Sequence, residues 1–93
     1  MGKYLIEFTK DAIKDLQQIK KAGRQADIKK IDTFLLEIQE DPRSGTGQPE
    51  QLKYQDGEVW SRKINKKDRF VYRIYEDRLV IIIVSAIGHY RDK

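Results

Sequence analysis

The fold is decided by "RFVYRIYEDRLVIIIVSAI", residues 69–87 of this 93-residue chain. Its first seven residues alternate, so that Phe70 and its i+2 neighbours share one face while Arg69 and Arg73 share the other. "EDR" then predicts a turn, and "LVIIIVSAI" is apolar on both faces, which is typical of a central strand. We therefore expect an antiparallel pair whose apolar face packs on helices and whose two arginines point away from the core.

The segment before this pair predicts one more strand. In "VWSRKI", residues 59–64, Trp60, Arg62 and Ile64 share a face, and "NKKD" turns into the next strand. Arg62 therefore requires a partner in the core, or its head group reaches solvent past an apolar stem. The preceding "RSGTGQ", residues 43–48, is rich in Gly and Ser and reads as a loop.

The N-terminal half predicts a strand and two helices. "KYLIEF", residues 3–8, is β-rich; Thr9 then caps a helix that stops near Gly23. A second helix runs from about Gln25 to Glu40, because apolar residues recur there at helical spacing and Asp41-Pro42 ends it. The order is strand, two-helix hairpin, then three strands. This is the α+β class, with a mainly antiparallel, twisted sheet in a single domain over residues 1–93.

Composition excludes several kinds of site. The chain has no cysteine and one histidine, so we expect no disulfide, no metal site and no cofactor. No signal peptide is recognisable, and the longest apolar run, residues 79–87, is shorter than the roughly 20 residues of a membrane-spanning helix. We therefore expect a cytoplasmic protein with no membrane association.

The net charge of +4 is concentrated in the C-terminal third. Residues 1–59 carry ten Lys and Arg against eleven Asp and Glu, whereas residues 60–93 carry nine against four. This asymmetry indicates either an anionic partner at one region or a solvated sheet face kept soluble by its cations.

Metal-free RNA cleavage is one chemistry open to these residue types. It requires a base for the 2′-hydroxyl proton, a cation for the charge on phosphorus and an acid for the leaving oxygen. Glu50 is a candidate base, Arg69 or Lys53 a candidate cation, and His89 a candidate acid. From the residues alone, a lone histidine such as His89 is more often an ordinary surface residue than a catalyst, and a glutamate after proline such as Glu50 is more often part of an ordinary loop.

The stretch "PRSGTGQPEQLKYQDGEVWSRKINKKDRFVYRI", followed by "GHY", resembles the YoeB/Txe branch of the RelE toxin family. The pattern is Pro-x-x-Gly-x-Gly-x-Pro-Glu-x-Leu-Lys, Trp-Ser-Arg, Arg-x-Val-Tyr and a terminal His-Tyr, and it covers residues 42–90 without a large gap. The resemblance implies a RelE-like fold and a ribosome-dependent mRNA endoribonuclease. It also implies a cognate YefM/Axe-like antitoxin, a possible homodimer, and operator DNA bound only through the antitoxin complex.

The resemblance also assigns roles to individual residues. It implies that Glu50 is the general base, Arg69 stabilises the phosphate, His89 is the general acid, and Tyr90 orients the RNA. The remaining positions implied or expected to line the RNA path are Lys53, Arg62, Lys63 and Arg73.

The chain departs from the family pattern at two places. The tail, residues 91–93, continues past the His-Tyr, and Lys66-Lys67 stand where the family often has acidic residues. Two other functions stay open: a ParE-like inhibitor of DNA gyrase with the same architecture, and a non-catalytic module that binds RNA or protein through a basic sheet face.

Overall fold

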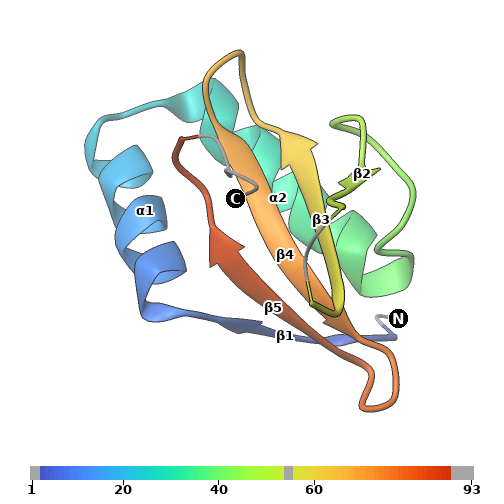
Figure 1. Cartoon of the computed structure of the whole chain (residues 1–93). Coiled ribbons are helices and arrows are strands. Elements are labelled where there is room, and N and C mark those ends of the chain that lie inside the picture. The colour runs from blue at the N-terminus through green and yellow to red at the C-terminus, as the bar shows by residue number, and fades with distance from the viewer. Residues whose placement is uncertain (1–2, 54–55, 89–93) are drawn as a thin grey trace.

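A computed structural model describes residues 3–53 and 56–88 (Figure 1). The predicted order of elements is confirmed, with one short strand added. The elements are β1 (Leu5–Phe8), α1 (Lys10–Lys21), α2 (Gln25–Glu40), β2 (Glu50–Gln51), β3 (Glu58–Lys63), β4 (Arg69–Tyr75) and β5 (Val80–Ser85). The first strand is shorter than predicted because the N–H groups of Lys3 and Tyr4 donate to the Gln39 carbonyl at the end of α2.

The strands form one sheet in the order β1-β5-β4-β3-β2. β1 pairs with β5 in parallel, and the other three pairings are antiparallel. β5 therefore has a neighbouring strand on each side and is a central strand, as its sequence predicted. β2 was predicted as loop, since two residues are too few to show an alternating pattern.

Both helices cover one face of the sheet (Figure 1). α1 begins as predicted, because the Thr9 hydroxyl accepts a hydrogen bond from the Ala12 N–H, and Gly23, with φ +70°, follows its end. The core lies between helices and sheet, and its principal members are Ala12, Ile19, Ile31, Phe34, Ile38, Phe70, Tyr72, Ile74, Ile81 and Ile83. The second face, which we call the open face, carries Arg69 and Arg73, as predicted from strand alternation.

An irregularity in the pairing of β4 with β5 directs the end of the last strand. Val71 lies opposite Ser85 and Tyr72 lies opposite Ile83, so Val84 is an extra residue on β5. Such a bulge bends its strand and is common next to functional sites. Beyond it the chain runs to Gly88, whose carbonyl accepts a hydrogen bond from the Arg69 N–H at 3.0 Å.

None of the helices in the described part of the chain is long and apolar enough to cross a membrane.

Candidate functional site

The strand register puts Glu50 and Arg69 on the same face of the sheet. Glu50 lies directly opposite Ser61, and Arg69 lies directly opposite Lys63. Opposite residues point to the same side, and Ser61 and Lys63 share a side because they are two apart. Ideal strand geometry separates the Glu50 and Arg69 Cα atoms by about 12 Å. Lys63 stands between them on the same face.

The loop that leads to Glu50 is held in place by Arg62. The Arg62 side chain is fully buried, and its guanidinium donates to the carbonyls of Pro42, Ser44 and Thr46. It also forms an ion pair with Glu37 of α2 at 2.7 Å. The loop therefore takes its shape from a guanidinium that is fixed in the core.

Two aromatic rings and the Glu37 carboxylate complete the surroundings of Arg62. Its guanidinium carbon lies 5.8 Å from the centroids of both Phe34 and Tyr72, and the Tyr72 hydroxyl accepts a hydrogen bond from its Nε. Burial raises the pKa of Glu37, but hydrogen bonds from Thr46 and the charge of Arg62 outweigh burial, so the net pKa is lowered. Arg62 and Glu37 thus form an ion pair whose hydrogen-bonding groups have partners in the core and the loop.

The structure places Arg62 in the core, away from the RNA path on which it was expected. A guanidinium with no exposed surface and five acceptors in the core cannot reach a ligand. The alternation pattern correctly placed Arg62 on the core face. It could not show that the Glu37 carboxylate and three loop carbonyls would meet it there and make complete burial tolerable.

Two glycines of the family pattern also have a packing role. A Cβ on Gly45 would lie 2.6 Å from a Glu37 carboxylate oxygen, and a Cβ on Gly47 would lie 2.6 Å from the Phe34 ring. Both have positive φ, +121° and +82°. The loop can approach the core this closely only because it lacks side chains at these points.

Arg69 is positioned by the turn between β3 and β4. Its guanidinium donates to the Asn65 carbonyl at 3.2 Å and to the Asp68 carbonyl at 3.4 Å. The side chain is half-buried, so part of the guanidinium remains open to a ligand. A cation held by neutral carbonyls keeps its full charge for an anionic partner.

A buried carboxylate, Asp68, fixes Gly88 beside Arg69. One oxygen accepts from the Gly88 N–H at 2.8 Å, and the other accepts from Asn65 and Arg24. Burial raises the pKa of Asp68, but these hydrogen bonds and the charge of Arg24 outweigh it and the net pKa is lowered. Asp15 of α1 adds a second anchor, because its carboxylate accepts from two further backbone N–H groups in the same segment.

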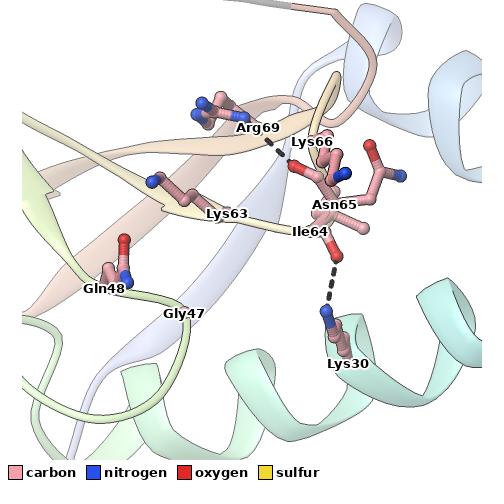
Figure 2. A pocket seen from close by; sticks show the side chains of 8 residues that line it. All are labelled: Lys30, Gly47, Gln48, Lys63, Ile64, Asn65, Lys66 and Arg69. Atoms are coloured by element: carbon pink, nitrogen blue, oxygen red, sulfur yellow. Dashed lines mark hydrogen bonds between the residues drawn. The ribbon is translucent and has the colours of Figure 1, made fainter.

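A cavity of about 550 Å³ opens at the end of β3, and we call it the end cavity (Figure 2). It is lined by Lys30, Gly47, Gln48, Lys63, Ile64, Asn65, Lys66 and Arg69. Four of these side chains are cationic, and none of the described residues in its lining is acidic. Figure 2 shows Lys30 rising from α2 to the Ile64 carbonyl, on the other side of the β3–β4 turn from Arg69.

The structure brings together some of the predicted residues and not others. Lys63 and Arg69 share the end cavity, and Glu50 lies one strand away from Lys63 and two strands away from Arg69. Lys53 is exposed just beyond β2, and Arg73, on the open face, donates to the Asp56 carbonyl. His89 and Tyr90 lie outside the described residues.

Sequence reasoning missed Lys30 and Gln48 as members of the site. Lys30 sits on a helix, 34 positions before the carbonyl that it contacts, and no local pattern marks that contact. Gln48 carries one available signal, because it stands between a glycine and a proline in the loop. Among the described residues, no group of three His, Cys, Asp or Glu side chains is arranged to hold a metal ion.

Comparison with known proteins identifies the family. Residues 8–90 match the family described as YoeB-like toxin of bacterial type II toxin-antitoxin system. The chain belongs to the YoeB toxin family. Toxin YoeB of Streptomyces coelicolor is 36% identical over 85 residues, which is 91% of this chain and 98% of that protein.

Solved structures of YoeB proteins share the fold. The YoeB dimer from Staphylococcus aureus superposes with a TM-score of 0.79 at 30% identity, covering 95% of this chain and 99% of that one. A heterotetrameric YoeB-YefM toxin-antitoxin complex from the same organism gives a TM-score of 0.77 at 31% identity, covering 94% and 98%. The predicted RelE-like α+β fold is thus confirmed for this YoeB-family chain.

Proposed function

We propose that this YoeB-family toxin is a ribosome-dependent endoribonuclease that cuts mRNA in the ribosomal A site by metal-independent acid–base catalysis. Glu50 removes the proton from a ribose 2′-hydroxyl, and the resulting 2′-oxygen attacks the adjacent phosphorus. His89 donates a proton to the departing 5′-oxygen. The products are a 2′,3′-cyclic phosphate and a free 5′-hydroxyl, so no water is consumed in the cut.

Arg69 is the electrostatic partner in this proposal. Negative charge builds on the non-bridging phosphate oxygens as the 2′-oxygen attacks, and a preorganised guanidinium stabilises that charge more than the ground state. Tyr90 orients the RNA, either through its hydroxyl or by stacking on a base. Lys53, Lys63 and Arg73 supply further positive charge to the RNA path, whereas Arg62 is a positioning residue for the loop before Glu50.

The observation that carries the proposal is the shared face of Glu50 and Arg69. A base and a phosphate-binding cation two strands apart, with Lys63 between them, leave room for one nucleotide linkage. The contact of Gly88 with the Arg69 backbone further supports it, since His89 is the next residue in the sequence.

We further propose the partners that the family relationship suggests. These are the ribosome with its mRNA in the cytoplasm, and a YefM-like antitoxin that neutralises the toxin. A homodimer is also proposed, by analogy with the Staphylococcus aureus protein. Operator DNA is bound only through the antitoxin complex.

The test is cleavage of a defined message on purified ribosomes. Wild type is compared with Glu50→Gln and His89→Gln, and primer extension maps the cuts. The proposal expects cuts within translated codons for wild type and a loss of about 10²–10⁴-fold in rate for each variant. DNA damage with intact mRNA on expression would instead support a gyrase inhibitor. If expression causes neither DNA damage nor mRNA cleavage, the result supports a non-catalytic binding module.

A further inference from the structure

We propose that the end cavity binds a second phosphate of the RNA, next to the one that Arg69 contacts, with Lys30 and Lys66 as its principal ligands. The inference rests on the proposed function, because it concerns the same substrate at the same site. It adds two lysines that the family pattern does not include. One of them, Lys66, stands where the family often has an acidic residue.

The first argument is the charge and size of the cavity. Lys30, Lys63, Lys66 and Arg69 all contribute to its lining, and no described acidic residue does. Uncompensated cations around one hollow attract an anion from solution. A volume of about 550 Å³ lies within the range of small-ligand sites and accommodates a phosphate with its ribose.

The second argument is the fixed position of Lys30. Its ammonium donates to the Ile64 carbonyl at 2.9 Å, and the next carbonyl along the chain, that of Asn65, accepts from Arg69 (Figure 2). The two cations are thus fastened one peptide unit apart, on opposite sides of the same turn. An ammonium has three N–H donors, so Lys30 keeps two for a ligand.

The third argument is the strained backbone of Gln48 in the cavity wall. Gln48 has φ +53°, a left-handed conformation that is unfavourable for a non-glycine residue. The preceding residue is held by the Lys63 N–H, which donates to the Gly47 carbonyl at 2.7 Å. Such strain persists where the surroundings over-determine it, and it concentrates at ligand sites. The Gln48 amide offers both donors and an acceptor to a ribose or a base.

The occupant follows from continuity with the proposed catalytic site. Lys63 and Arg69 belong to both, so an RNA phosphate at Arg69 has its neighbouring nucleotide within reach of the end cavity. RNA carries a phosphate at each nucleotide, so a strand held at one cationic point gains from a second one beside it. An acidic segment of the antitoxin is the competing occupant, and the experiment separates the two.

The test uses two matched pairs of substitutions in the full-length chain. Lys30→Gln with Lys66→Gln removes two cations from the cavity. Lys29→Gln with Lys67→Gln removes two exposed cations from the neighbouring positions, which do not line it. Both pairs change the net charge equally. Binding of a short single-stranded RNA, 2′-O-methylated to prevent cleavage, is measured by fluorescence anisotropy from 50 to 200 mM salt.

The expected result is a change in salt dependence for the cavity pair alone. Losing one phosphate contact makes the slope of log affinity against log salt less steep by about 0.7. Between 50 and 200 mM salt, the affinity of this variant therefore falls by a factor that is roughly 2.6-fold smaller than for wild type. Lys66→Gln is also tested alone, since Lys66 has no hydrogen bond to another described residue whose loss would disturb folding. Equal effects of the two pairs overturn the inference.

Two further outcomes separate this inference from the proposed function. If wild type cuts no message on ribosomes, the nuclease proposal fails while the binding comparison still tests the cavity. If wild type cuts and the cavity pair cuts and binds as the control pair does, only the second phosphate site is overturned. If the Lys30→Gln, Lys66→Gln variant binds RNA normally but is no longer neutralised by the antitoxin, the occupant of the end cavity is the acidic segment of the antitoxin. That result also overturns the second phosphate site.

Discussion

Replacing Arg62 by methionine tests whether the loop before Glu50 depends on a buried guanidinium. Methionine fills most of the aliphatic volume but leaves Glu37 and three loop carbonyls without their donor. Breaking a buried ion pair costs about 3–5 kcal/mol. Because the Glu37 side chain is 28% exposed and regains some water, we expect the lower end, about 3 kcal/mol.

That loss is large for a chain of this length. At about 0.05–0.15 kcal/mol per residue, the whole domain has roughly 5–14 kcal/mol of stability. At about 4–8 °C per kcal/mol, the melting temperature is expected to fall by about 12–24 °C. Urea and thermal unfolding followed by circular dichroism measure both quantities, in a His89→Gln background so that expression is tolerated.

The matched control is Lys63→Met, at the next residue on the opposite face. Lys63 is exposed, so its substitution is expected to change stability by no more than about 0.5 kcal/mol. Glu37→Gln combined with Arg62→Met is expected to cost little more than Arg62→Met alone, because the acid has already lost its partner. Arg62→Met with wild-type stability would refute the structural role and return Arg62 to the RNA path.

Three other predictions concern the site and its supports. Glu50→Gln and Arg69→Ala should each abolish cleavage on ribosomes while the melting temperature stays within a few degrees of wild type; a loss like that of a core variant would count against their assignment. The net pKa of Asp68 is lowered from its ordinary value of 3.8, so its contribution to stability is present above that value and disappears as the pH falls through its folded-state pKa. Acid unfolding of Asp68→Asn should therefore be shallower below pH 4 than that of wild type, and equal slopes would show that Asp68 is not linked to folding. Gly47→Ala should lower the free energy of unfolding by about 2–5 kcal/mol, because it adds a clash with Phe34 to an unfavourable φ. Gly23→Ala, with open space around it, should lower it only by the backbone part of about 1–2 kcal/mol. Equal losses of stability in urea unfolding would argue against the close approach of Gly47 to Phe34.

Much of the fold follows from local patterns. The bounds of α2, the cap at Thr9 and the central position of β5 are read correctly, because each depends on residues that are neighbours in sequence. Strand alternation also assigns Arg69 and Arg73 to the open face. β2 is missed, since it is a strand only through its pairing with Ser61 and Trp60.

The candidate site follows from sequence only in part. The family resemblance supplies Glu50 and Arg69, and the register gives them a common face. The end cavity could not be predicted, because Lys30 meets the β3–β4 turn through a contact that spans 34 positions. Asp68 likewise gave no sign that it would anchor Gly88, 20 positions further on.

By itself the sequence determined the two helices, the four longer strands and the face of each that a side chain occupies, because those properties have short periods along the chain. Only the tertiary structure decided which cations face a ligand and which are structural. Adjacent in sequence, Arg62 and Lys63 differ completely in this respect: one is enclosed by Glu37 and the loop, the other lines the end cavity. The physical reason is that the free energy of a charge depends on what stands opposite it, and those groups come from distant parts of the chain.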